Sequence, residues 1–311
     1  MVTRALFSPL AFLAIAFAVA GCKPDFGNPA SLVTERRILA VKAEPPEVRA
    51  GDTATFRALV VSPDGTEASP AVDWSLCVAP KPLDENNIVT SACVDGSNDS
   101  LQGFGSATND ATATVPLKAC SLFGSDPPPQ AAGQPALRPR DPDVTGGYYQ
   151  PLKLVAGDAT AFALERITCS VTSGGAAISI EYAMTYKANQ NPALTPLSAT
   201  VDGAAADLGA LPAGRDVDFD IGWDAAKVES FPVFDLVSQT LVTKREAMRV
   251  SWFASSGSFL HEVTGRDDKD MATDTTNRWT APKTPGPVHL WAVLRDSRGG
   301  IDYASYDLTI R

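Results

Sequence analysis

Apolar and polar residues alternate along several short stretches of the chain, with the period of two that is typical of half-buried β-strands. In residues 55–61, Phe56, Ala58 and Val60 share one apolar face. The same alternation recurs in six further runs: Val72, Trp74 and Leu76; Ile178, Ile180, Tyr182, Met184 and Tyr186; Val217, Phe219, Ile221 and Trp223; Met248, Val250, Trp252 and Ala254; Leu290, Ala292 and Leu294; and Ala304, Tyr306, Leu308 and Ile310. Short strands separated by turns rich in Gly, Pro, Asp and Asn predict an all-β fold of antiparallel sandwiches.

A short sequence echo indicates two copies of one module. Gly51 precedes Phe56 by the same spacing at which Gly214 precedes Phe219. A later predicted strand in each half contains one tryptophan, Trp74 or Trp252. A glycine turn, an inward phenylalanine and then a core tryptophan resemble the start of an immunoglobulin-like fold. The alternative is a chance similarity between two short segments.

The end of the chain carries a second resemblance. Residues 277–282, followed by residues 288–296 and by Arg298, Gly299 and Gly300, resemble the closing strands of bacterial cadherin-like and PKD-like surface modules. Together the two resemblances imply two antiparallel immunoglobulin-like β-sandwich domains. They imply nothing about the ligand, because such folds host many functions.

The predicted domain boundary lies near residues 188–192, because Pro192 interrupts the chain after the alternating run that ends at Tyr186. The predicted division is a signal peptide over residues 1–21, a tether over 22–34, a first domain over 35–190 and a second over 191–311. Residues 124–147 are too rich in proline for central strands and predict a long loop inside the first domain. The alternative is an interdomain linker, which would place residues 148–186 in the second domain.

The first residues have the order of an export signal, with one positive charge at Arg4 and then an apolar run. This run is shorter than the roughly 20 residues that span a bilayer, which disfavours a retained transmembrane helix. Val19, Ala20, Gly21 and Cys22 resemble the lipobox of bacterial lipoproteins. That resemblance implies cleavage before Cys22 and lipidation of its sulfur by fatty acids such as palmitate. The alternative is an ordinary signal peptide in which Cys22 is incidental.

The residue after Cys22 bears on the destination. Lys23 stands where, in lipoproteins of enteric bacteria, an aspartate favours retention at the inner membrane. The resemblance therefore implies a lipid anchor in the outer membrane, on the periplasmic or the cell-surface side. Two or more acyl chains make such an anchor stable, because each buried methylene adds about 0.8 kcal/mol.

Four cysteines remain once Cys22 is set aside: Cys77, Cys93, Cys120 and Cys169. An even number in an exported chain predicts two disulfides, and the sequence leaves all three pairings open. A metal site is the weaker alternative, because no two cysteines are closely spaced and the two histidines lie far downstream. All four cysteines belong to the first predicted domain, so the disulfides are expected to stabilise that domain alone.

The charge balance is acidic, with a formal net charge of −10. Removal of residues 1–21 takes away only Arg4 among the charged residues, which makes the mature charge −11. An acidic surface repels nucleic acid, so a nucleic-acid partner is disfavoured. The simpler explanation of this charge is the solubility of an exported protein.

Motifs for catalysis are lacking. The sequence has no phosphate-binding loop, no HExxH helix and no Gly-x-Ser-x-Gly elbow. His261 and His289 are the histidines available as a general base, and His289 alternates with apolar neighbours as if it pointed out of a strand. No catalytic residue is therefore predicted, although a glycosidase-type pair of carboxylates stays open as an alternative.

Two groups of residues are candidates for binding. Asp267, Asp268, Asp270 and Asp274 supply oxygen ligands of the kind that calcium prefers, but their spacing is not that of an EF-hand, and a solvated loop is the simpler interpretation. Tyr148 and Tyr149 could line a recognition surface, because tyrosine offers rigid contact area with a polar tip. The simpler interpretation is that they pack at the edge of a sandwich.

These observations favour a non-catalytic, lipid-anchored envelope protein that acts as a structural or binding component, with an envelope protein or a polysaccharide as partner. No cofactor is expected apart from the possible calcium ion. The alternative is an envelope hydrolase or carbohydrate-active enzyme that uses a carboxylate pair. Solute binding for a transporter is disfavoured, because no pattern of α/β lobes occurs.

Overall fold

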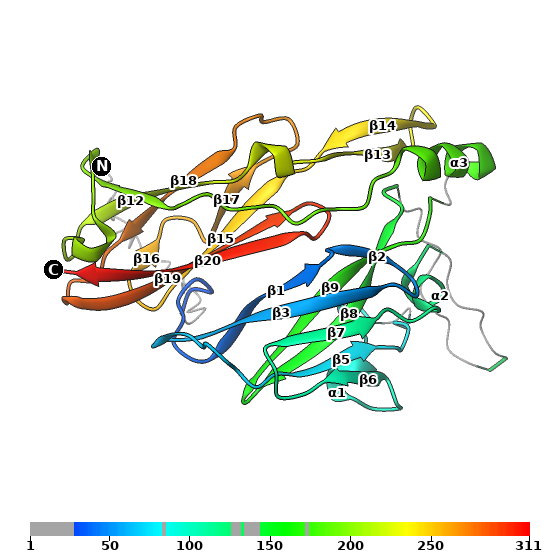
Figure 1. Ribbon diagram of the computed structural model, residues 1–311, viewed down its shortest axis with the longest axis horizontal. Coiled ribbons are helices and arrows are strands. Elements are labelled where there is room, and N and C mark those ends of the chain that lie inside the picture. The colour runs from blue at the N-terminus through cyan, green and yellow to red at the C-terminus, as the bar shows by residue number, and fades with distance from the viewer. Residues whose placement is uncertain (1–27, 83–84, 126–131, 134–143, 172–173) are drawn as a thin grey trace, which may run out of the picture.

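The first half of the chain forms two sheets, according to the computed structural model, which describes residues 28–82, 85–125, 132–133, 144–171 and 174–311 (Figure 1). In one sheet, the central strand β3 pairs with β1 on one edge and with β4 and β7 on the other. The other sheet has the order β2-β9-β8-β5-β6, and β2 joins β9 in parallel. We call these sheets the N-terminal module. Its strands are β1 (Arg37–Glu44), β2 (Glu47–Arg49), β3 (Thr53–Ser62), β4 (Gly65–Thr66), β5 (Asp73–Cys77), β6 (Leu101–Gly105), β7 (Asp110–Thr114), β8 (Gly147–Ala156) and β9 (Ala159–Thr168).

The second half forms the C-terminal module, with one sheet ordered β11-β10-β12-β18-β16 and another ordered β17-β15-β19-β20. A separate hairpin, β13–β14, is inserted between β12 and β15. The strands are β10 (Ser198–Val201), β11 (Ala204–Ala205), β12 (Asp216–Gly222), β13 (Ser230–Asp235), β14 (Thr240–Arg245), β15 (Met248–Ala254), β16 (Ser258–Phe259), β17 (Val263–Arg266), β18 (Asp274–Thr280), β19 (Gly286–Asp296) and β20 (Ile301–Ile310). The helices of the chain are α1 (Ser91–Asp95), α2 (Ala119–Phe123), α3 (Gly175–Thr185) and the 3-10 turns η1 (Leu208–Ala210) and η2 (Ala225–Lys227).

The two modules share one strand order. The order β1-β3-β7 against β9-β8-β5-β6 in the first corresponds to β10-β12-β18 against β20-β19-β15-β17 in the second. This is the arrangement of an immunoglobulin-like sandwich. The prediction of a β-rich fold with antiparallel sheets is therefore confirmed, and most of the alternating runs are strands of these sheets.

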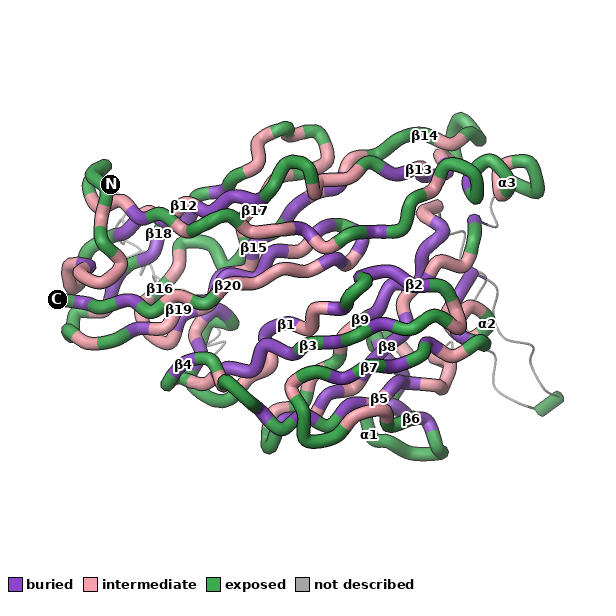
Figure 2. The backbone as a smooth tube through the Cα atoms, viewed as in Figure 1, coloured by how far each residue is buried: buried purple, intermediate pink, exposed green. Residues whose placement is uncertain are grey.

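The sequence echo marks equivalent places in the two cores. Gly51 and Gly214 both have positive φ, at 93° and 66°, so each turn uses a conformation that favours glycine. In the N-terminal core the rings of Phe56 and Trp74 lie 6.3 Å apart, and in the C-terminal core those of Phe219 and Trp252 lie 6.4 Å apart. All four side chains are buried, and Figure 2 shows buried residues following the strands of both modules.

The modules lie side by side, with β1 next to β20 (Figure 1). Strand β3 contributes to both sides of this arrangement: Phe56, Ala58 and Val60 point into the N-terminal core, whereas Leu59 and Val61 point towards the C-terminal module. They meet Trp291 and Val293 of β19 in a buried apolar group. Trp291 also donates its indole N–H to Thr66 across the interface, over 2.7 Å.

One predicted strand is wrong. Residues 178–186 do not form the last strand of the first domain, because residues 175–185 are helix α3. Ile178, Tyr182 and Tyr186 are spaced by four residues, and they pack together on one side of the helix against Phe234. Ile180 and Met184, which completed the apparent alternation, are 62% and 80% exposed. The helical period, not the period of two, was the informative one.

Residues 31–33, at the end of the predicted tether over residues 22–34, pack against the C-terminal module. Leu32 forms a parallel bridge to Ala254 at the end of β15, and Val33 is fully buried in the interface group. Backbone bonds from Val33 to Ala254 and from Ala254 to Ser31 hold this segment on the C-terminal module. Apolar side chains at positions 32 and 33 explain why it packs against the protein.

Several predictions fall outside the described residues. These are the signal peptide over residues 1–21, the lipidation site Cys22 and most of the proline-rich segment. Within the described residues, no helix combines the length and apolar character needed to cross a bilayer.

Candidate functional site

Two disulfides fasten loop helices to one end of the N-terminal module. Cys77 at the end of β5 bonds to Cys93 of α1, and Cys120 of α2 bonds to Cys169 just after β9. The expectation of two disulfides in the first half is confirmed, and the structure supplies the pairing that the sequence left open. We call this end of the module the disulfide pole. Two such bonds indicate an extracytoplasmic location.

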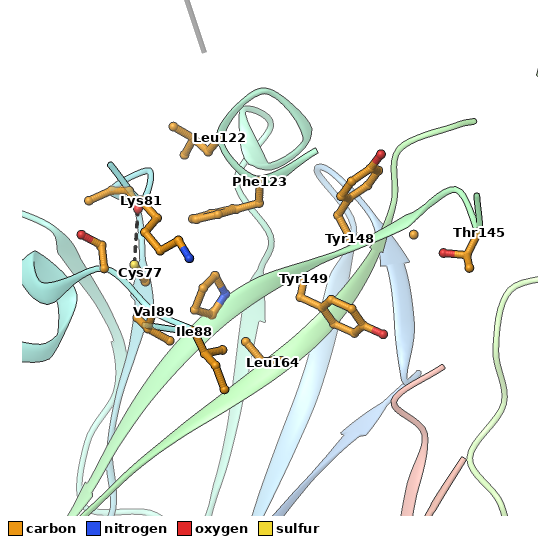
Figure 3. A pocket seen from close by; sticks show the side chains of 14 residues that line it. Cys77, Lys81, Ile88, Val89, Leu122, Phe123, Thr145, Tyr148, Tyr149 and Leu164 are labelled. Atoms are coloured by element: carbon orange, nitrogen blue, oxygen red, sulfur yellow. Dashed lines mark hydrogen bonds between the residues drawn. The ribbon is translucent and has the colours of Figure 1, made fainter. Parts of the chain in front are cut away.

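A pocket of about 360 Å³ opens at the disulfide pole. Phe123 of α2, Ile88 of the loop before α1, and Leu164 of β9 form apolar walls around it (Figure 3). Lys81 is the charged residue among the described residues that line it. The pocket therefore suits an apolar group that carries a negative charge at its edge.

The loop that forms one wall is held by its own hydrogen bonds. Lys81 donates to the carbonyl of Asn87 over 2.8 Å, which leaves two ammonium N–H groups for other partners. Glu85 accepts from the backbone N–H and the hydroxyl of Ser91 at 2.8 and 2.6 Å, and these bonds lower the pKa of the Glu85 carboxyl. Val89 is buried beside Cys77 and Cys93, while Ile88 is 81% exposed. The loop is thus anchored by the buried side chain of Val89, and the side chain of Ile88 is exposed to solvent.

Both predicted tyrosines line this pocket, but they differ in role because neighbouring strand residues point to opposite faces. Tyr148 is buried in the N-terminal core. Tyr149 is partly exposed, and the guanidinium of Arg166 lies 5.9 Å from the centre of its ring. Tyr149 is therefore the one of the two that offers contact area, and its role in recognition stays a prediction.

The four aspartates of the predicted calcium site do not converge. Asp267 accepts the backbone N–H groups of Lys269 and Asp270, and Asp268 lies 3.5 Å from Lys244. Asp270 and Asp274 both pair with Arg266, each at 3.1 Å. In the described part of the chain, no three His, Cys, Asp or Glu side chains are placed to hold one metal ion. The structure therefore gives these carboxylates partners other than a shared cation.

The two histidines lie apart from the pocket, on the C-terminal module. The Nδ1 of His289 lies 2.8 Å from Asp307 Oδ1, a cross-strand contact between β19 and β20. His261 is exposed just before β17. The Asn277 side chain accepts from the backbone N–H of His261 and donates to its backbone carbonyl. No bond between either imidazole and a serine or cysteine occurs within the described residues.

A largely buried network of charged and polar residues, which no sequence pattern indicated, joins the two modules. It consists of Glu47, Arg166, Tyr186, Asn189, Glu229, Glu246, Asp296 and Arg298, which we call the junction network. The Glu47 carboxylate of β2 accepts from the Tyr186 hydroxyl at 2.7 Å and from the Asn189 backbone N–H at 2.9 Å. Arg298, in the turn between β19 and β20, donates to Glu229 and Glu246 over 2.7 and 2.8 Å.

Burial raises the pKa values of two carboxyl groups in this network, those of Glu246 and Asp296. Arg298 and Glu246 are 1% and 0% exposed. Burial, followed by repulsion from Asp296, raises the pKa of Glu246 to about 7, although the bond to Arg298 opposes the shift. Burial also raises the pKa of Asp296, against the hydrogen bond from Asn189. No sequence pattern could reveal the network, because its members are charged residues scattered from position 47 to position 298.

Comparisons with known proteins find similarity at the level of solved structures. No family model and no curated protein matches the chain. An adhesin of Yersinia pseudotuberculosis, InvE, is 9% identical, with 92% of this chain and 62% of that chain covered and a TM-score of 0.25. The fibronectin(III)-like modules of Clostridium thermocellum CbhA are 11% identical, with coverages of 87% and 93% and a TM-score of 0.22.

A third similar structure is a nucleoside hydrolase-related hypothetical protein from Saccharophagus degradans. It is 18% identical, with 40% of this chain and 26% of that chain covered and a TM-score of 0.22. The chain thus spans less than two thirds of this protein and of the adhesin. TM-scores this low support no conclusion about function, and the fold assignment rests on the strand order itself.

Proposed function

We propose that this chain is a lipid-anchored, non-catalytic binding component of a bacterial outer membrane, and that it binds an envelope partner at the disulfide pole. The observation that carries the proposal is the pocket bounded by Ile88, Phe123 and Leu164 between two disulfide-bonded segments. The resemblance of residues 19–22 to a lipobox supports the anchor, and the disulfides support the location outside the cytoplasm.

The position of the first described residues bears on how the anchored protein is oriented relative to the membrane. Ser31 and Leu32 pack on Ala254, at the end of β15 that lies away from the junction network. Cys22 precedes Ser31 by nine residues, which span at most about 30 Å. Lipid on Cys22 therefore tethers the far end of the C-terminal module, and the disulfide pole, next to the junction network, faces away from the bilayer.

The chemistry of the pocket defines the partner. An apolar side chain fills the space between Phe123 and Leu164, and a carboxylate beside it can accept the two remaining N–H groups of Lys81. Disulfides hold the pocket walls before the partner arrives, which lowers the entropic cost of binding. A protein segment with an apolar residue next to an acidic one fits this description.

The anchor is tested by fractionation of cells that express the wild type or Cys22→Ser. The wild type is expected in outer-membrane fractions, with acyl chains on its N-terminal peptide by mass spectrometry. The variant is expected in soluble or medium fractions. Equal partitioning of the two proteins would refute the anchor and leave the pocket to be judged separately.

The pocket is tested by placing a photo-crosslinking amino acid at position 88 or, as a control, at position 260, where Leu260 is 65% exposed on the other module. A defined partner is expected from position 88 and not from position 260, and Leu164→Asp is expected to abolish the product. Identical products from both positions, or products that persist in Leu164→Asp, would refute binding at the disulfide pole.

A further inference from the structure

A second cavity lies between the modules, on the outer face of the β1-β3-β7 sheet. It has a volume of about 410 Å³ and is lined by Lys42, Glu44, Thr55, Arg57, Asp110, Asp302 and Tyr303. The first five come from the N-terminal module, and the last two come from β20 of the C-terminal module. We call this cavity the intermodule groove. Ligand sites often form where two domains meet.

The polar side chains of the groove are fixed in pairs that keep unused bonding capacity. Arg57 donates to both oxygens of Asp110 at 2.6 and 2.7 Å, which uses two of its five N–H groups. Lys42 donates to Asp302 at 2.9 Å, and Asp302 also accepts from the backbone of Leu194. The groove therefore presents oriented donors and acceptors next to each other, each already held in place by its partner.

Tyr303 adds an aromatic side chain to this polar surface. Its ring packs partly against the interface group of Leu59, Val61 and Trp291, which fixes its position. Burial raises the pKa of Tyr303 above the ordinary value for a phenol. This hydroxyl forms no hydrogen bond with another described residue, and the charges of Arg57, Asp110 and Asp302 act on it.

The charges of the groove select the class of ligand. Lys42 and Arg57 face the carboxylates of Glu44, Asp110 and Asp302, a near balance that favours neither a polyanion nor a simple cation. A ligand dense in hydroxyls can both donate to the carboxylates and accept from the guanidinium and ammonium groups. The aromatic ring offers an apolar face to the C–H groups of such a ligand.

We infer that the intermodule groove is a binding site for an uncharged oligosaccharide, in addition to the proposed partner site at the disulfide pole. The outer face of the sheet extends the site along its strands, because Thr55 pairs with Thr112 and Thr53 pairs with Thr114, each at 3.0 Å. These exposed hydroxyls form a row that continues from Arg57 and Asp110. A chain of several sugar units fits this row better than a single sugar.

The C-terminal module provides a matched control. Asp218 and Arg278 form the equivalent cross-strand pair, between β12 and β18, at 2.8 Å. This pair is exposed to a similar extent as Arg57 and Asp110, and it does not line the groove. Removal of either arginine is expected to leave the melting temperature nearly unchanged, because exposed ion pairs contribute little to stability.

The experiment is isothermal titration of the purified mature chain with cellotetraose, chitotetraose, maltotetraose and mannotetraose, and with dextran sulfate as the polyanion. We expect binding of at least one tetrasaccharide, weakened about tenfold by Arg57→Ala through loss of charged hydrogen bonds. Arg278→Ala and Leu164→Asp are expected to bind like the wild type, and Tyr303→Phe more weakly.

Three results would overturn the inference: no tetrasaccharide bound at millimolar concentration, equal effects of Arg57→Ala and Arg278→Ala, or binding of dextran sulfate alone. Because Leu164→Asp acts at the disulfide pole, its effect on crosslinking and the effect of Arg57→Ala on titration can be told apart. Failure at one site therefore does not decide the other.

Discussion

The two modules have equivalent cores but different ends. Phe56 meets Trp74 in the first core as Phe219 meets Trp252 in the second, and an exposed arginine–aspartate pair joins equivalent strands in both. The C-terminal module adds Trp279, whose ring lies 5.7 Å from that of Phe219. It has no cysteine, whereas the N-terminal module has two disulfides.

This difference shows where each module needs additional stability. The C-terminal module is stabilised mainly by the aromatic groups and aliphatic strands between its sheets. In the N-terminal module, the segments around α1 and α2 are loops with short helices, which offer little apolar area of their own. Covalent bonds fix these segments without filling the pocket between them. Disulfides at the pole are therefore a means of building a shaped surface from loops.

Reduction should produce the largest difference between the modules. Each disulfide is expected to stabilise the N-terminal module by about 2 to 4 kcal/mol, so that loss of both costs it about 4 to 8 kcal/mol. The C-terminal module should be affected only through the interface. Hydrogen exchange with and without reductant, read by peptide, measures both modules at once. Equal loss of protection in both would contradict this division.

Truncation of the core tryptophans should come next. Trp74→Ala and Trp252→Ala each remove a buried aromatic side chain, and each is expected to cost about 3 to 5 kcal/mol. Urea unfolding followed by the remaining tryptophans measures the loss, and Leu260→Ala, at a 65% exposed position, serves as the control. If either tryptophan variant unfolds like the control, its place at the centre of a sandwich is wrong.

Much of this architecture could be predicted from the sequence, because an alternating strand records its two faces locally. Residues 216–222 alternate without interruption, and they are β12. The echo of Gly51 and Phe56 with Gly214 and Phe219 located the equivalent strands β3 and β12 of the two modules. A turn with positive φ and an inward aromatic ring both depend on residues that are close in sequence.

The features that were predicted wrongly or not at all depend on contacts between residues that are distant in sequence. The apolar residues of 178–186 fit both a period of two and a spacing of four, and the packing of Ile178, Tyr182 and Tyr186 around Phe234 corresponds to the helix. The junction network depends on residues that are distant in sequence, such as Glu47 and Arg298, so no local pattern marks it. The pocket likewise depends on the disulfide pairing. Tyr149 was identified, whereas Ile88 and Phe123 were missed because nothing in the sequence places them opposite it.

The junction network offers a test of how firmly the two modules are coupled. Arg298→Ala leaves the buried carboxylate of Glu246 and the partly buried carboxylate of Glu229 without their main cation, which is expected to cost about 3 kcal/mol or more. Arg278→Ala removes an exposed arginine and should cost at most about 1 kcal/mol. Urea denaturation measures both. Similar losses in the two variants would mean that the junction contributes no more than a surface pair.

The last expected effect is a gradual dependence of stability on pH that originates at the junction. The pKa of Glu246 rises from 4.5 to about 7 on folding, so between these values the folded state holds a proton that the unfolded state has released. Stability from this group is complete below about pH 4.5 and is lost as pH rises through 7. The slope approaches about 1.4 kcal/mol per pH unit where one proton separates the two states.

Glu246→Gln should flatten the curve of melting temperature against pH between 5 and 8, whereas Glu181→Gln, at an exposed position on α3, should leave it parallel to that of the wild type. If Glu246→Gln also gives a parallel curve, Arg298 keeps Glu246 ionised in the folded protein, and the junction is a permanent ion pair that does not take up a proton on folding.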